Sequence, residues 1–168
     1  MRGFGKWIAL FVLGPLLLAA LPGASLRAQQ VPAQERCRAI TRAEVRALFD
    51  RWNTALATND PEAVARTYAA DAVLLPTVEN GPLIGHDAIR GYFVSFLTKH
   101  PHGAIDSRTV HVGCNLAYDV GTYTFTLDGP TADSHIKVHA RYTYIYAPYD
   151  GRWLIVHHHS SAMPQPGQ

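Results

Sequence analysis

The stretch DGRWLIVHHHSSAMP, residues 150–164, combines a turn signal with an alternating pattern and three consecutive histidines. An Asp-Gly turn followed by alternation of side-chain character predicts a β-strand. Neighbouring side chains of a strand point to opposite faces, so His157 and His159 share one face, and His158 shares the other with Ser160. The three histidines therefore cannot form one cluster by themselves. These histidines could serve in a metal site, as part of an acid/base pair, or in ordinary packing within a pocket. The rest of the sequence is needed to choose among these three roles.

Upstream of this strand, the spacing of apolar residues changes from a helical period to a period of two near Asp106. Runs rich in Thr, Tyr, Val and Ile, separated by turn signals, predict three more strands. They are SRTVHVGCNLAY (residues 107–118), DVGTYTFTLDG (119–129) and HIKVHARYTYIYA (135–147).

Helical signals come before the strands. A capping box at Thr41 and Glu44 begins a helix that is expected to end near Thr58. Asp60, followed by a proline, is the expected N-cap of a second helix. The second helix, a short strand and a third helix are expected at residues 59–72, 73–76 and 85–100. Helices first and antiparallel strands afterwards indicate an α+β domain with the helices on one face of the sheet.

Residues 1–28 have the pattern of a secretory signal peptide: a short basic start, an apolar run over residues 7–21 and small residues up to Ala28. Cleavage is expected after Ala28, and a cut after Ala24 is an alternative. An uncleaved membrane anchor is a further alternative, but Gly14 and Pro15 interrupt the apolar run, which is shorter than a span of about 20 residues. The sequence therefore predicts an exported protein, periplasmic or secreted, with no membrane association after cleavage.

The charge balance depends on this signal. The whole chain has 15 Lys and Arg against 13 Asp and Glu, and three of the basic residues, Arg2, Lys6 and Arg27, lie in the predicted signal. Removing the signal leaves 12 basic and 13 acidic residues, without a basic run. The mature chain therefore offers no electrostatic basis for binding nucleic acid or an anionic membrane surface.

Cys37 and Cys114 are the two cysteines of the chain. In an exported protein such a pair is more often a disulfide than two free thiols. Neither lies in a C-x-x-C motif or beside a histidine, so a metal pair or a thiol nucleophile is the weaker alternative. The chain is expected to divide into the signal (1–28), an N-terminal segment (29–40), a single domain (41–163) and a flexible tail (164–168).

The order of the predicted elements and four stretches carry a family resemblance. The stretches are FDRWNTALATNDPEAVARTYAADAVLLPT (residues 49–77), GHDAIRGYF (85–93), ARYTYIY (140–146) and DGRWLIVHHHSSAMP. They resemble the nuclear transport factor 2-like superfamily. Within it, the last strand is similar to the association domain of calcium/calmodulin-dependent protein kinase II, and the chain resembles exported bacterial proteins related to that domain and to SnoaL-like polyketide cyclases.

The resemblance implies a cone-shaped fold, in which helices pack on a curved antiparallel sheet and enclose a ligand-binding pocket. It also implies assembly through the sheet, as a homodimer or a larger homo-oligomer. Kinase activity is not implied, because this sequence has no Gly-rich phosphate loop, HRD motif or DFG motif.

The resemblance also implies which residues line the pocket. Arg141 matches the family's pocket arginine at the start of the penultimate strand, whereas Ile89, Val120 and Ser160 stand where the family has other polar residues. His158 and Ser160 would then face the pocket, and the flanking histidines would lie on the outer face. Three of the four polar pocket positions of the family are therefore occupied by different residues here. For this reason the small carboxylate inferred as the kinase domain's ligand is not carried over directly to this chain.

Arg141 and three aromatic residues have alternative roles. A guanidinium within an apolar strand must either reach water or find a partner, which would be an anionic ligand or a carboxylate such as Asp119. Trp52, Tyr68 and Tyr92 are candidate pocket residues, with packing in the core as the alternative for each.

A metal site is an alternative role for the outer histidines. His157 and His159 have the H-x-H spacing of two ligands on one strand face, and a third ligand would have to come from His139 or His111 on other strands. Ordinary packing and hydrogen bonding is the preferred interpretation, so no metal is expected.

Two functions are compatible with these observations. The first is an exported, self-associating protein that binds a small carboxylate or a hydrophobic metabolite. The second is a small isomerase-like or cyclase-like enzyme, in which His158 with Asp119 or Asp71 moves a proton next to a carbonyl. The sequence carries no nicotinamide-binding or flavin-binding fingerprint, so no cofactor is expected. An oxidoreductase activity would therefore have no cofactor-binding motif to support it. Binding is preferred, because no motif fixes a catalytic pair.

Overall fold

The computed structural model describes residues 37–164. The predicted signal peptide and most of the predicted tail lie outside the described residues. The elements are α1 (Arg42–Ala57), α2 (Pro61–Ala65), β1 (Tyr68–Leu75), β2 (Leu83–Ile84), α3 (His86–Phe96), the 3-10 turn η2 (Leu97–Lys99), β3 (His102–Val112), β4 (Ala117–Asp128), β5 (His135–Tyr149) and β6 (Arg152–Ala162). The predicted α+β class is confirmed. No helix within the described range is long and apolar enough to cross a membrane.

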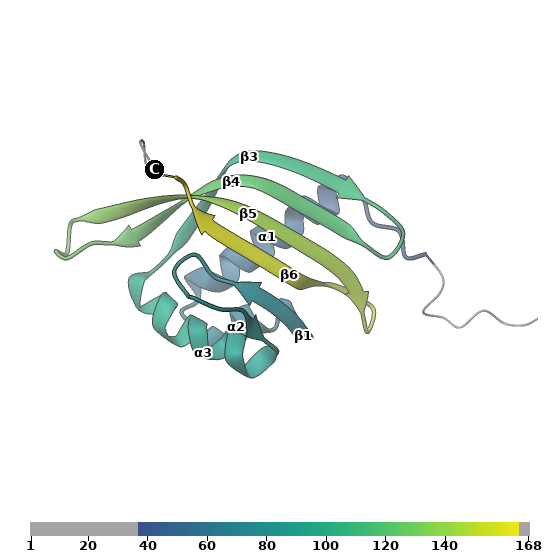
Figure 1. Ribbon diagram of the computed structural model, residues 1–168, viewed down its shortest axis with the longest axis horizontal. Helices are drawn as coiled ribbons and strands as arrows, with labels where there is room; N and C mark the ends of the chain where they lie inside the picture. The colour runs from purple at the N-terminus through teal and green to yellow at the C-terminus, as the bar shows by residue number, and fades with distance from the viewer. Residues whose placement is uncertain (1–36, 165–168) are drawn as a thin grey trace, which may run out of the picture. The chain divides into compact units, whose positions relative to one another are not determined.

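One six-stranded sheet has the order β2-β1-β6-β5-β4-β3. Strands β3 to β6 form the predicted antiparallel series, but β1 runs parallel to β6, so the sheet is mixed rather than wholly antiparallel. Figure 1 shows α1 crossing behind the long strands, with α2 and α3 beside β1. The helices thus cover one face of the sheet, which we call the inner face.

Local sequence signals explain where the first two helices begin. The hydroxyl of Thr41 accepts a hydrogen bond from the backbone N–H of Glu44 (3.2 Å), and the Glu44 carboxylate accepts one from the backbone N–H of Thr41 (2.7 Å). This reciprocal pair satisfies two backbone donors at the start of α1, as the capping box predicted. The carboxylate of Asp60 accepts from the backbone N–H of Glu62 (2.9 Å) and starts α2 in the same way.

Two predicted boundaries were wrong. The second helix ends at Ala65, and the residues from Tyr68 onward form β1 instead of continuing the helix to residue 72. Pairing with β6 places Tyr68 opposite Ile155, and this long-range contact overrides the local helical pattern. The strand expected over residues 107–118 is two strands, because a turn over residues 113–116 separates β3 from β4.

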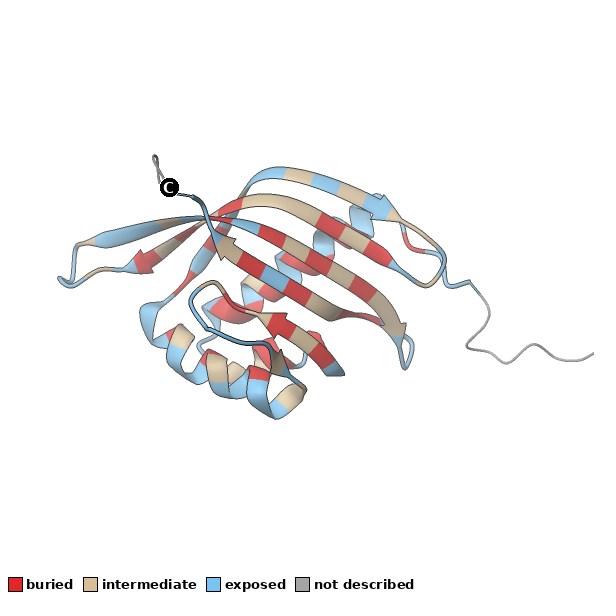
Figure 2. Cartoon of the chain, in the orientation of Figure 1, coloured by how far each residue is buried: buried red, intermediate tan, exposed pale blue. Residues whose placement is uncertain are grey.

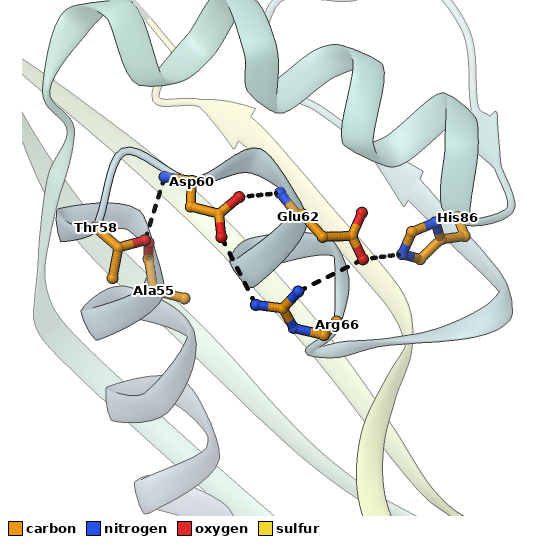
Figure 3. A network of polar contacts seen from close by, with 6 residues as sticks. All are labelled: Ala55, Thr58, Asp60, Glu62, Arg66 and His86. Atoms are coloured by element: carbon orange, nitrogen blue, oxygen red, sulfur yellow. Dashed lines mark hydrogen bonds and ion pairs between the residues drawn. The ribbon is translucent and has the colours of Figure 1, made fainter.

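A surface network joins α2 to the start of α3. Arg66 lies between Asp60 and Glu62, 3.7 Å from a carboxylate oxygen of each. Figure 3 shows His86 reaching the same Glu62 from α3, with 3.3 Å between Nε2 and the carboxylate. These side chains are substantially exposed, so the network contributes little to stability.

The core lies between the helices and the inner face of the sheet. Buried and less buried residues alternate along β4, β5 and β6 in Figure 2, as expected for strands with one covered face. Trp52 of α1 is at the centre, 1% exposed. Its ring contacts the rings of Phe49, Phe93, Phe125, Tyr144 and His158.

Candidate functional site

A small cavity lies between α1, α3 and the inner face of β4 and β6. Its lining is Trp52, Leu74, Pro76, Thr77, Tyr92, Phe93, Phe96, Tyr123, Phe125, His158 and Ser160. The predicted residues Trp52, Tyr92, His158 and Ser160 are brought together here, and His158 and Ser160 lie on the inner face as expected. The cavity has a volume of about 20 Å³, which is enough for one water-sized molecule.

His158 sits at the end of a chain of buried polar groups. The indole N–H of Trp52 donates to the hydroxyl of Tyr68 (3.0 Å), and this hydroxyl is 2.9 Å from Nδ1 of His158. An indole N–H can only donate, so the Tyr68 oxygen accepts from Trp52. Among the described residues the other partner of this hydroxyl is Nδ1 of His158, so the Tyr68 proton is paired only when it donates to Nδ1. This arrangement assigns the histidine proton to Nε2. Tyr68 therefore acts behind His158 and positions it.

Nε2 of His158 is buried and has no hydrogen-bond partner among the described residues. The whole residue is only 3% exposed, and the ring of Tyr144 stacks on it with 4.0 Å between ring centres. Burial, followed by the charges of His157 and His159, lowers the pKa of His158 to about 3. The imidazole is therefore neutral near pH 7 and presents one unpaired N–H donor.

The other polar groups of the cavity are hydroxyls. The hydroxyl of Tyr123 donates to Oγ of Ser160 (2.6 Å), and Thr77 Oγ1 pairs with the same oxygen. Burial raises the pKa of Tyr92 to about 12, with a smaller contribution from Glu79, so its hydroxyl stays protonated. The site thus consists of neutral hydrogen-bonding groups within aromatic walls.

Arg141 does not line this cavity, so its predicted place beside His158 was wrong. It is exposed and lies with His159 and Ser161 along a shallow outer depression. The alternation of β5 turns its neighbour Tyr142 inward and Arg141 outward. The alternative salt bridge from Arg141 to Asp119 was also wrong, because Asp119 lies on the inner face with a different partner.

That partner is Arg108, which sequence reasoning missed. Nε of Arg108 is 3.1 Å from a carboxylate oxygen of Asp119, and the hydroxyl of Tyr142 donates to the other oxygen (2.9 Å). The guanidinium also lies over the ring of Phe49, 5.3 Å from its centre. Burial raises the pKa of Asp119, and Arg108 opposes that rise. The pair is a second polar centre on the inner face.

This pairing separates the residues of the predicted catalytic pair. Asp119 forms an ion pair with Arg108 and accepts a hydrogen bond from Tyr142, whereas His158 is hydrogen-bonded to Tyr68. The alternative carboxylate, Asp71, accepts a hydrogen bond from the exposed Tyr149 (3.0 Å). The structure therefore does not assemble the acid/base pair that the enzyme hypothesis requires.

The outer histidines find no third metal ligand. Nδ1 of His139 is 2.8 Å from the hydroxyl of Thr124, and His111 stacks on Tyr118. Within residues 37–164, no group of three His, Cys, Asp or Glu side chains could hold a metal ion. The alternative site at His157 and His159 is thus left without support.

The predicted disulfide between Cys37 and Cys114 is present, with 5.0 Å between the Cα atoms. It ties the segment before α1 to the turn between β3 and β4. The backbone N–H of Arg38 donates to the side-chain oxygen of Asn115 (2.7 Å) at the same place. The start of the described chain is therefore fixed to the sheet.

Comparisons with known proteins agree with this fold. The sequence model of the calcium/calmodulin dependent protein kinase II association domain matches residues 41–164. A solved structure from Xanthomonas campestris, described as such an association domain, is 47% identical, covers 80% of this chain and 99% of its own, and has a TM-score of 0.71. No curated protein matches the chain.

More distant structures show the fold alone. A nuclear transport factor 2-like protein from Salmonella enterica is 19% identical, with a TM-score of 0.64 over 74% of this chain and 92% of its own. A nuclear transport factor 2-like protein of unknown function from Pseudomonas putida is 22% identical, with a TM-score of 0.62 over 74% and 88%.

Proposed function

The chain belongs to the calcium/calmodulin dependent protein kinase II association domain family, and from this premise we propose that it is a self-associating protein that binds a small, neutral, mostly apolar molecule beside His158. The observation that carries the proposal is the buried Nε2–H of His158, which has no partner among the described residues. A buried donor left unpaired costs about 1–3 kcal/mol. A ligand oxygen in the cavity would offset this cost.

The charges around the cavity favour a neutral ligand over a carboxylate. His158 is neutral at pH 7, and the neighbouring polar groups are hydroxyls. Arg141, the cation expected to hold an acid, lies on the outer face. A carbonyl or ether oxygen can accept from His158 without bringing an uncompensated charge into an aromatic site. Of the two ligand classes expected from sequence, the hydrophobic metabolite is therefore better supported.

Tyr92 and Phe96 determine how such a molecule could enter. Their stacked rings, with 5.5 Å between centres, line the cavity on one side. On their other side they line a groove of about 340 Å³ on the surface of α3. The cavity has room for only a water-sized molecule, so a larger ligand would need these two side chains to move, which would join the cavity to the groove.

An acid/base enzyme is less well supported. A general base works best when its pKa is near the operating pH. A histidine with a pKa of about 3 is a weak base at pH 7, and its partner is the hydroxyl of Tyr68 rather than a carboxylate. These properties suit a fixed hydrogen-bond donor in a binding site.

Self-association and export are parts of the same proposal. The name of the matching family supports association, and the disulfide together with the signal-like sequence of residues 1–28 supports an oxidising compartment. We expect light scattering to give at least a dimer at micromolar protein concentration. A monomer over that range would contradict the association part without affecting the pocket.

Three probes test the pocket: acetophenone has an acceptor oxygen, ethylbenzene lacks it, and benzoate adds a charge. We expect acetophenone to raise the thermal midpoint most, because ligands that bind the folded state stabilise it. His158→Phe keeps a ring but removes the donor, and it should weaken acetophenone binding about fivefold while leaving ethylbenzene unchanged. His157→Phe, on the opposite face, is the matched control. Equal binding of acetophenone and ethylbenzene to the unaltered protein would refute the role of His158.

A further inference from the structure

A second groove, with a lining different from that of the cavity at His158, lies between the segment before α1, one side of α1 and the start of β6. Its volume is about 320 Å³. Its polar lining consists of Arg38, Glu44, Arg51 and Trp153. The pocket proposed above does not include any of these residues, so each of the two sites can be tested without the other.

Both arginines of the groove are held by backbone carbonyls near the start of β6. The guanidinium of Arg38 donates to the carbonyl of Gly151, and that of Arg51 donates to the carbonyl of Trp153 (2.8 Å). A guanidinium has five N–H donors, so each group keeps donors for another partner. Their positions are set before a ligand arrives, which lowers the entropic cost of binding.

The indole of Trp153 also lines this groove. Trp153 is 7% exposed, and its Nε1–H is buried with no hydrogen-bond partner in the described chain. The one carboxylate of the lining, Glu44, is already engaged, because one of its oxygens accepts from both the backbone N–H and the hydroxyl of Thr41. The groove therefore has more donors than acceptors and carries two positive charges against one negative charge.

The remaining wall is apolar. Ile40 and Leu48 line it, each 8% exposed, together with two alanines. We propose that this groove binds an anion with an apolar body, such as a medium-chain carboxylate. The carboxylate would lie against Arg38 and Arg51, where charge-assisted hydrogen bonds are strong, and the hydrocarbon would cover Ile40 and Leu48.

The disulfide completes this site. Arg38 directly follows Cys37, whose bond to Cys114 ties this part of the chain to the sheet. Reduction removes that tie and leaves Arg38 held at this place by its hydrogen bonds to Asn115 and Gly151. The proposal therefore predicts that an oxidised chain binds the carboxylate more tightly than a reduced one.

Octanoate is the test probe, with octanol as the neutral analogue and sulfate as the charge without the apolar body. We expect octanoate to raise the thermal midpoint by about 3 °C at about ten times its Kd, and to move the indole N–H resonance of Trp153, assigned with Trp153→Phe. Arg51→Met should weaken octanoate binding at least about tenfold. Arg42→Met, on the same helix but outside the groove, should bind normally.

Each other result overturns the proposal. Sulfate as effective as octanoate would show a simple ion site, and octanol as effective would show an apolar groove without an anion requirement. Binding that survives both Arg51→Met and Arg38→Met would also refute it, and the resonance of Trp153 in the unaltered protein decides the matter if either variant fails to fold. Loss of self-association in Arg51→Met, measured by light scattering, would assign the groove to a second copy of the chain.

Discussion

The neutral state of His158 follows from its neighbours, and it links stability to pH. Tyr144 covers one face of the imidazole and the edge of Trp52 meets it, so water cannot solvate a charged ring. The pKa is about 3 in the folded chain against about 6.5 when unfolded. Below about pH 6.5 the unfolded chain binds a proton that the folded chain does not, so folding becomes less favourable as the pH falls toward 3.

We therefore expect the free energy of unfolding to fall by up to about 1.4 kcal/mol for each pH unit below about 6.5 from this residue alone. His158→Phe should show a shallower loss over the same range. Urea unfolding at about pH 7, 6 and 5 measures the difference. Identical slopes for the unaltered protein and His158→Phe would mean that His158 is not the buried proton-excluding group.

Arg141 and Arg108 show where sequence reasoning about single residues succeeded and failed. Alternation along one strand correctly placed His158 and Ser160 together, because that part of β6 is regular. Arg141 was assigned by resemblance against the alternation of its own strand, which turns Tyr142 inward. Arg108 could not be placed from sequence, because a bulge between Ile105 and Ser107 reverses the facing of the residues that follow.

At the scale of elements, the predicted helix starts were correct, whereas the predicted end of the second helix, which depends on a distant contact of β1, was wrong. The capping box of α1 and the N-cap of α2 are made by residues a few positions apart, so the sequence alone reveals them. β1 depends on pairing with β6, a partner more than eighty positions away. A local pattern carries no information about such a partner, which explains why Tyr68 was placed in a helix.

The bulge in β3 requires a glycine opposite it in β4. A Cβ atom on Gly121 would come within 2.0 Å of the carbonyl oxygen of Ser107, which belongs to a backbone that cannot move without breaking the strand pair. We expect Gly121→Ala to lower the free energy of unfolding by about 3 kcal/mol, measured by chemical denaturation.

Gly91 provides the matched control for this substitution. It lies in α3, and a Cβ atom there would meet nothing within 4 Å. Gly91→Ala should therefore stabilise the protein by about 0.5–1 kcal/mol through its higher helix propensity. A Gly121→Ala protein as stable as the unaltered one would show that the two strands can separate at the bulge without cost.

At the scale of the whole molecule, the disulfide closes a large loop. Cys37 and Cys114 are 77 residues apart, and their bond restricts the unfolded chain far more than the folded one. We expect replacement of both by serine to reduce stability by up to about 4 kcal/mol. Guanidinium unfolding with and without reductant is the measurement, and reductant should not affect the double variant. If reductant left the guanidinium midpoint of the unaltered protein unchanged, a structural role for the disulfide would be contradicted.

The position of β6 has a consequence for how the chain is made. This strand comes last among the described elements, yet it lies between β1 and β5 in the sheet. The ribosome synthesises β1 long before β6. Until β6 is made, the edge of β1 that pairs with it stays unpaired, and His158 is not yet part of the chain. An interrupted product ending before Arg152 would lack both the central strand and the pocket, and its open edges would favour aggregation. The complete sheet can form only after translation has reached β6, so the binding site cannot form before that strand has been made.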